Sequence, residues 1–212
     1  MLLSLMNDPN FITKFLIVGI VMIIALIFHN VFQVWVAKKL GDPSPSNLGY
    51  GKFDPQTQLE PTGLILMAIF GLGWPKQIPI NGRNLRGNKE ALVWYAGPLA
   101  YLIVAFFATA AGLIFFKLGK TVLYSAFITA SGYAILHAVI NLLPVYPLDG
   151  AKAALVWGNN DIRRVIRQIQ SWGLLGFMGA VIILQMLGIT SALTVFFNSI
   201  IFNILKPLLN LF

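Results

Sequence analysis

Long, mostly uncharged apolar stretches alternate with short polar and basic segments along the chain. Three of these stretches approach or exceed the roughly 20 residues that a helix needs to cross a bilayer, at residues 11–36, 91–116 and 121–143. Two shorter stretches, 171–187 and 189–205, predict a tight helical hairpin that turns at the glycine between them. The pattern therefore predicts five full transmembrane helices.

The segments between these stretches have a different composition. Residues 40–60 are rich in Gly, Pro, Asp and Ser, which is typical of loops, and short extended pieces around residues 48–53 favour a small β-hairpin, with a further strand at 78–81. Residues 62–74 are apolar but short, and their glycines weaken a straight helix, so we expect a re-entrant or half-span element there. The expected fold class is an all-α polytopic membrane protein, one integral membrane domain over residues 1–212, with a small cytoplasmic-side β hairpin.

Composition supports a membrane protein. The chain is 58% hydrophobic and only 10% charged, whereas a soluble domain carries about a quarter charged residues. The absence of cysteine excludes disulfides and thiolate metal sites. The N-terminus lacks a basic region and a small-residue cleavage site, so we expect a retained first span and no signal peptide.

The net charge of +8 is explained by the positive-inside rule, so no nucleic acid is expected as a partner. If residues 62–74 re-enter without crossing, 12 of the 15 basic residues face the cytoplasm. These include Arg163, Arg164 and Arg167 with Lys152, a patch that we expect to contact lipid headgroups.

Two groups of polar residues interrupt the predicted spans on the same, cytoplasmic half. His29, Asn30 and Gln33 have the spacing of the zinc-protease signature H-E-x-x-H, in which two histidines bind the metal and the glutamate activates water. Residues 141–150 contain two prolines three residues apart, followed by Asp149. Irregular backbone at membrane depth is typical of places where a site is built.

Five motifs in order give the chain a resemblance to the site-2 protease family of intramembrane metalloproteases, in its compact bacterial branch without a PDZ domain. They are residues 29–33 for H-E-x-x-H, 41–43 with 60–63 for G-D-P…D-P-x-G, 73–81 for G-W-x-x-P-V-P-V-N, 96–101 for A-G-P-x-x-N and 141–150 for N-L-L-P-x-x-P-L-D-G.

The resemblance implies a zinc site with altered residues. His29 and Asp149 keep family ligand positions, Gln33 replaces the second histidine and Asn30 replaces the base. Tyr101 stands where the family has an asparagine linked to handling of the substrate backbone. The scaffold motifs are present, and three residues linked to the chemistry are replaced, which favours a catalytically degenerate member.

Other residues do not restore the missing chemistry. Gln33 offers zinc only a neutral carbonyl oxygen, a poor ligand compared with imidazole. His137 lies 12 residues before Asp149, about 18 Å along a helix, so we expect it to be an interhelical hydrogen-bonding residue. Asn30 cannot accept a proton, and Glu60 is a remote candidate for the base. We therefore expect no catalytic residue and no bound metal.

The simplest interpretation of the remnant residues is a hydrogen-bonded polar cluster of His29, Asn30, Gln33 and Asp149 inside the bundle. A pocket that still has the shape of a substrate is compatible with this cluster. We expect four residues to contact a substrate or partner: Tyr101, Asn141, Gly97 and Pro98. In the loop before D-P-x-G, where the family commonly has a histidine, this chain has Gln58.

Three functions remain open from the sequence. The first is a pseudoprotease that binds or scaffolds another membrane protein or its transmembrane helices. The second is an active intramembrane zinc metalloprotease with an altered ligand set, and the third is a structural subunit of a larger membrane complex. Each places the chain in the lipid bilayer as a multi-pass protein, which we expect to be the bacterial inner membrane.

Overall fold

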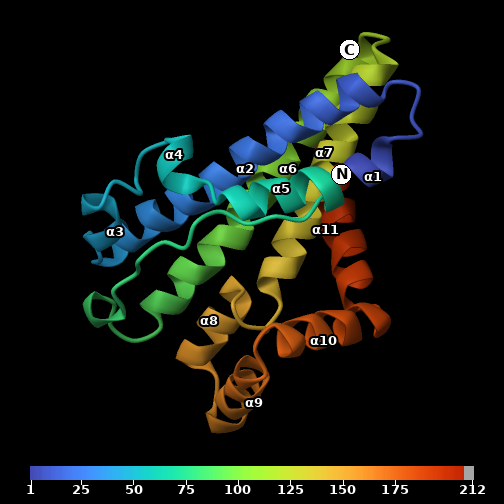
Figure 1. Ribbon diagram of the computed structural model, residues 1–212. Coiled ribbons are helices and arrows are strands. Elements are labelled where there is room, and N and C mark those ends of the chain that lie inside the picture. Colours follow the sequence, from blue (N-terminus) through green and yellow to red (C-terminus); the bar gives the residue numbers. More distant parts are fainter. Residues whose placement is uncertain (208–212) are drawn as a thin grey trace.

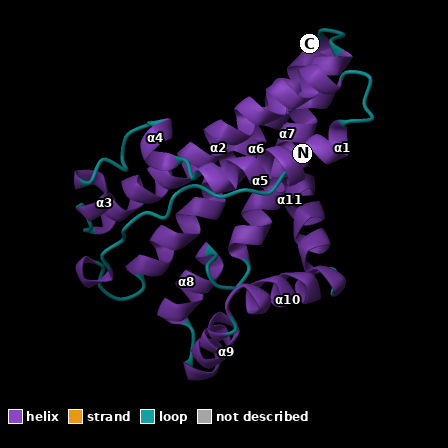
Figure 2. Cartoon of the chain, in the orientation of Figure 1, coloured by secondary structure: helices purple, strands orange, loops and turns teal. Residues whose placement is uncertain are grey.

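The computed structural model describes residues 1–207, and this part of the chain is helical with connecting loops and no strand (Figure 2). The helices are α1 (Leu2–Leu5), α2 (Phe11–Leu40), α3 (Ser44–Asn47), α4 (Pro55–Gln58), α5 (Pro61–Phe70), the 3-10 turn Gly82–Asn84, α6 (Lys89–Lys117), α7 (Thr121–Leu142), α8 (Asp149–Trp157), α9 (Asn160–Ser171), α10 (Gly173–Met186) and α11 (Ile189–Leu205). All-α architecture is thus confirmed.

Helices α2, α6 and α7 form the centre of the molecule and pack against one another (Figure 1). Small residues lie where α6 meets α7, among them Ala105, Ala130 and Ala134, all fully buried. Small side chains let helix backbones approach closely, which is how helices associate in lipid. Helix α11 packs on α6 and α7 and adds Ile201 and Leu205 to the same core.

The three central helices are each long enough and apolar enough to cross a bilayer, and a bent pair formed by α9 and α10 brings the number of candidates to four. Helix α11 is shorter, with 17 residues. Large apolar side chains point outward from the bundle, such as Ile20, Phe107 and Ile114, where a soluble protein would carry charge. The chain is a membrane protein.

Two short helices occupy the segment for which a hairpin was expected. Pro45 lies in the first turn of α3 and Pro55 begins α4, while Asp54 caps α4 by accepting a hydrogen bond from Gln56 N at 3.1 Å. Proline favours the first turn of a helix and cannot donate to a strand ladder. The pairing that does form is a single antiparallel bridge between Leu59 and Pro75.

The strand expected at residues 78–81 is also absent. The backbone N–H of Ile80 donates to the carbonyl of Ile78 at 3.1 Å, which makes a tight turn. A backbone group used in a local turn is not available to a neighbouring strand. Residues 71–81 instead form an extended connection beside the bundle, which we call the return segment.

The expected re-entrant element consists of helix α5 and an extended return. Helix α5 ends at Gly71, which has φ 85°, and the chain then folds back so that Trp74 crosses the start of the helix. A Cβ atom at Gly63 would lie 2.2 Å from the carbonyl oxygen of Trp74. This crossing requires glycine at position 63, and it holds the return segment against the bundle.

Asp42 joins the loop after α2 to the return segment. Its carboxylate is fully buried and accepts hydrogen bonds from Ser44 N, Asn84 Nδ2 and Asn81 N at 3.1, 2.8 and 2.8 Å. Burial alone would raise the pKa of Asp42, but these hydrogen bonds outweigh it and hold the pKa below its ordinary value.

Replacing Asp42 with Asn is expected to destabilise the protein by about 1–3 kcal/mol, because an amide nitrogen would face donors. Stabilisation by Asp42 is fully present above its unfolded pKa of about 3.9 and is lost as the pH falls through the lower folded pKa. Thermal unfolding of the detergent-solubilised chain between pH 7 and pH 3 measures both effects. The exposed Asp161, changed to Asn, is the control, and an equal loss in both variants would contradict the assignment.

Candidate functional site

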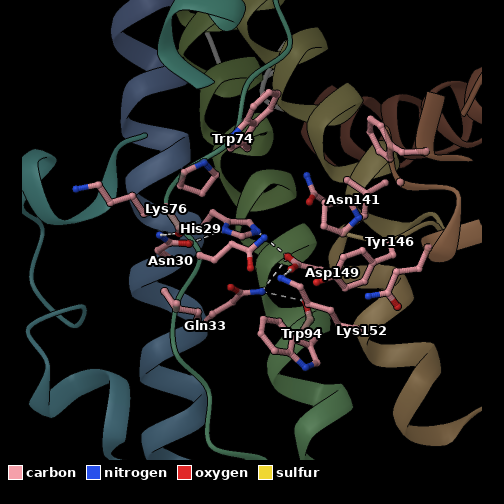
Figure 3. A pocket seen from close by; sticks show the side chains of 18 residues that line it. His29, Asn30, Gln33, Trp74, Lys76, Trp94, Asn141, Tyr146, Asp149 and Lys152 are labelled. Carbon is pink, nitrogen blue, oxygen red and sulfur yellow. Dashed lines mark hydrogen bonds and ion pairs between the residues drawn. The ribbon is translucent and has the colours of Figure 1, made fainter. Parts of the chain in front are cut away.

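The polar residues of α2 meet Asp149 in the middle of the helical bundle (Figure 3). His29 and Gln33 lie one turn apart on α2, so their side chains share a face. The irregular backbone after α7 ends at Leu148, and α8 then begins with Asp149 pointing toward that face. All four remnant residues are at most 5% exposed, so the expected polar cluster is what the structure contains.

The carboxylate of Asp149 contacts three other side chains of the site. Its Oδ2 lies 2.8 Å from His29 Nε2 and accepts a hydrogen bond from Gln33 Nε2 at 2.9 Å. Its Oδ1 lies 3.7 Å from Lys152 Nζ, one turn along α8. A buried carboxylate is stable only when it is paired and hydrogen-bonded, and here one oxygen atom receives two partners from α2.

Asn30 connects α2 to the return segment. Its Nδ2 donates to the carbonyl oxygen of Lys76 at 2.8 Å, and its Oδ1 lies 3.1 Å from His29 Nδ1. The amide orientation follows from these neighbours, because a carbonyl oxygen can only accept. A carboxylate at position 30 could only accept hydrogen bonds and would be repelled by that carbonyl oxygen, whereas the carboxamide of Asn30 donates to it.

The donor set does not fit a catalytic zinc ion. Gln33 Nε2 donates both to Asp149 Oδ2 and to the carbonyl oxygen of Trp94, at 3.2 Å in the second case. Two acceptors fix the amide with its nitrogen toward the junction, and a carboxamide nitrogen has no lone pair for a metal. His29 and Asp149 are then two possible ligands where a catalytic zinc takes three. Within residues 1–207, no group of three His, Cys, Asp or Glu side chains could hold a metal.

Helix α6 passes close to the cluster at Gly97. A Cβ atom there would lie 2.3 Å from His29 Nε2, 2.5 Å from Asp149 Oδ2 and 2.5 Å from Gln33 Nε2. Gly97 and the next residue, Pro98, are both buried inside α6. Gly97 lets the helix backbone reach the cluster, and contact of Gly97 and Pro98 with a partner stays a prediction.

Tyr101 and His137 lie behind the cluster. Tyr101 is fully buried, and its ring is 4.8 Å from the ring of His29 and 5.4 Å from that of His137, centre to centre. His137 accepts a hydrogen bond from Gly73 N at 3.2 Å and donates to Tyr133 O at 2.8 Å. His137 thus joins α7 to the return segment, which is a loop, whereas a hydrogen bond between helices was expected. The tyrosine ring separates His137 from the other histidine.

An open cavity of about 570 Å³ lies beside the cluster, on the side away from Tyr101. Its walls combine aromatic and apolar side chains with a few amides, chiefly from the return segment, the α7–α8 connection and the α9–α10 bend. Residues that shape it include Trp74, Gln77, Ile78, Trp94, Asn141, Tyr146, Asp149, Lys152, Gln170 and Phe177. Asn141 therefore lines the cavity, whereas Tyr101, Gly97 and Pro98 do not.

Lys152 lines the cavity, although it was expected only in a patch that contacts lipid headgroups. Its ammonium group lies 4.3 Å from the centre of the Trp94 ring. Burial lowers the pKa of Lys152, and the carboxylate of Asp149 acts in the opposite direction. The signal was present in the sequence, because Lys152 is three residues after Asp149 and so shares its helix face.

Gln58 and Glu60 are not among the residues that line the cavity. Gln58 is buried, and its Nε2 donates to the carbonyl oxygens of Tyr50 and Lys52 at 2.6 and 3.0 Å, which fixes the loop before α5. Glu60 is the N-cap residue of α5.

Comparison with known proteins finds bacterial relatives of this chain. The chain is 32% identical over 169 residues to the Bacillus subtilis protein named "Putative zinc metalloprotease YwhC", a match that covers 75% of this chain and 77% of the relative. It is 24% identical over 199 residues to "Putative zinc metalloprotease Rip2" of Mycolicibacterium smegmatis, covering 91% of this chain and 74% of the relative. No family model and no solved structure matches the chain.

Both relatives are named as putative zinc metalloproteases, and this defines the class of protein to which the chain is related. Because a match at 32% identity covers three quarters of both chains, the chain belongs to the site-2 protease family.

Changing Gly97 to Ala is expected to destabilise the protein by about 1–3 kcal/mol, because the added methyl group overlaps three polar atoms at once. This loss would outweigh the higher helix propensity of alanine. Thermal unfolding in detergent measures the effect.

The matched control is Gly132→Ala in α7, where a Cβ atom meets nothing within 4 Å. Alanine there should leave stability unchanged or raise it by up to about 1 kcal/mol. If both variants behaved alike, the close approach at Gly97 would not be a stabilising constraint.

Proposed function

We propose that this chain is a pseudoprotease of the site-2 protease family that binds another membrane protein without cleaving it. The observation that supports this most directly is the orientation of Gln33, whose amide nitrogen bridges Asp149 and the carbonyl of Trp94. A hydrogen-bond donor thereby occupies the place of a metal ligand. Asn30 likewise donates where the family has a base.

The cavity supports a binding role. Its volume of about 570 Å³ is within the range of ligand pockets, and it is walled by aromatic side chains with a small number of amides. Trp74, Trp94 and Phe177 offer apolar contact, while Asn141 and Gln77 offer hydrogen bonds. A segment of a transmembrane helix that has apolar side chains and exposed backbone groups has this chemistry.

The proposed setting is a multi-pass protein of the bacterial inner membrane. The three long helices α2, α6 and α7 account for three spans, and we assign the shorter apolar helices α10 and α11 to the membrane beside them. The distribution of 12 basic residues on one side and 3 on the other supports this topology. The relatives from bacteria support the location.

Purified wild-type chain is expected to contain well below one zinc ion per chain, because a catalytic zinc takes about three protein ligands. The double variant Asn30→Glu with Gln33→His restores the family groups and should retain severalfold more zinc after dialysis. Elemental analysis of each protein gives the metal content directly.

Asn30→Glu alone is the control, since it leaves Gln33 in place and should not gain zinc. Stoichiometric zinc in the wild-type chain, together with cleavage of a membrane peptide that chelators abolish, would identify an active metalloprotease and overturn the proposal.

Photo-reactive side chains placed at Gln77 of the return segment and at Phe177 of α10, both of which line the cavity, should cross-link to the same membrane protein in the native membrane. The same group at Ile114, an exposed position of α6, should not. Mass spectrometry of the cross-linked products identifies the partner, and an identical set of products from all three positions would contradict a specific binding cavity.

A further inference from the structure

Helix α9 separates its polar and apolar residues sharply. At 100° per residue, Ile162, Val165, Ile166 and Ile169 fall on one side, and the polar residues occupy the rest of the circumference. Ile166 is buried in a small apolar cluster with Ala151 and Ala154 of α8. A short amphipathic helix of this kind is typical of the boundary between water and lipid.

The polar face of α9 carries an open groove of about 490 Å³ that is lined only by polar and basic residues. They are Asn160, Arg163, Arg164, Arg167, Gln168 and Ser171. None of the three arginines has an ion pair with an acidic residue in the described part of the chain. Three neighbouring cations without a counter-charge from the protein favour an anionic ligand.

One of the arginines is already held in place. The guanidinium of Arg163 donates through Nη2 to the carbonyl oxygen of Val156 at 2.7 Å, and its Nε is buried without a partner among residues 1–207. Arg164 and Arg167 are exposed, and at 100° per residue both lie on the same side of Arg163 around the helix. A held guanidinium beside two exposed ones offers several N–H donors on one face, an arrangement that suits the oxygens of a phosphate group.

Two tryptophans mark the depth of α9 in the membrane. Trp157 ends α8 just before α9, and Trp172 follows α9 directly; they are 50% and 59% exposed. Tryptophan is enriched at the level of lipid headgroups. After Trp172 the chain bends by 120° into the apolar helix α10, so α9 lies where a span begins.

The same helix also forms one wall of the cavity. Gln170 of α9 lines the cavity, as do Gly173 and Phe177 of α10. Helix α10 runs across the direction of the three central helices (Figure 1), and the elements it packs against are α9 and α11. The position of this wall therefore depends on how α9 is held.

We propose that the basic face of α9 binds the phosphate group of an anionic phospholipid and thereby fixes the α9–α10 wall of the cavity. A lipid is the source of the phosphate because the groove lies beside two interfacial tryptophans and the apolar helix α10, where an acyl chain has apolar surface to cover. Anionic headgroups attract arginines at this depth. The lipid site stands apart from the proposed pseudoprotease function, whereas its effect on binding in the cavity rests on that function.

Native mass spectrometry of the full chain in neutral detergent tests the lipid site. With phosphatidylglycerol and phosphatidylcholine added in equal amounts, we expect the wild-type chain to retain phosphatidylglycerol at about tenfold excess. Arg164→Gln with Arg167→Gln should reduce this preference at least severalfold. The matched control, Arg83→Gln with Arg86→Gln, removes the same charge from an exposed loop and should keep the preference.

Three results would overturn the site. Equal retention of both lipids by the wild-type chain would show no selectivity. An equal loss in both double variants, with unfolding temperatures unchanged, would show a general effect of charge. Displacement of phosphatidylglycerol by inorganic phosphate at the same concentration would show that the groove binds free phosphate.

The effect on the cavity wall is tested by a distance measurement. The chain has no cysteine, so spin labels can be attached only at introduced cysteines, here Leu72→Cys in the return segment and Met178→Cys in α10. Phosphatidylglycerol should narrow the distribution of distances between the labels in the wild-type background and not in Arg164→Gln with Arg167→Gln. An unchanged distribution despite bound lipid would overturn the coupling, and the zinc content would still report separately on the pseudoprotease proposal.

Discussion

The carboxylate of Asp149 is the constraint on which the rest of this structure depends. An acidic group at 4% exposure inside an apolar bundle must be compensated, since an unpaired charge there would cost several kcal/mol. The compensation comes from His29 and Gln33, so α8 must begin where α2 presents both. Helix α6 must then pass without a side chain at Gly97, because the three polar atoms already fill that space.

The same arrangement joins the helices by hydrogen bonds at the positions where the family has its metal ligands. In a metal centre the cation would neutralise the acidic ligand and hold the helices together. Here, hydrogen bonds from a carboxamide and an imidazole occupy the junction, and a second carboxamide, Asn30, binds the backbone of Lys76. These hydrogen bonds keep the return segment and α8 in contact with α2.

Much of the architecture could be predicted because the membrane leaves few alternatives. Apolar stretches of sufficient length predicted the three central helices, and the positions of His29, Gln33 and Asp149 predicted their meeting. The loop after α2 was harder to predict, since turn-rich sequence is compatible with both a hairpin and short helices. Pro45 and Pro55 favour helices there, because each lies in the first turn of one.

Other features depend on packing that a sequence pattern does not encode. Tyr101 was expected at the binding surface because of its place in a motif, yet its ring fills the space between His29 and His137. The orientation of the Gln33 amide follows from the carbonyl of Trp94, which is 61 residues away. The place of Lys152 beside Asp149 could have been predicted, because a spacing of three residues puts both side chains on one face of a helix.

The close approach at Gly97 has a consequence for how members of this family are interpreted. The glycine is needed for two helices to touch, whatever chemistry occurs beside them. A lineage that abandoned hydrolysis would therefore keep the residue for as long as it kept its architecture, while neighbours such as Asn30 were free to drift. A glycine at this position is therefore evidence of a shared fold, and it is not evidence that the protein hydrolyses a substrate.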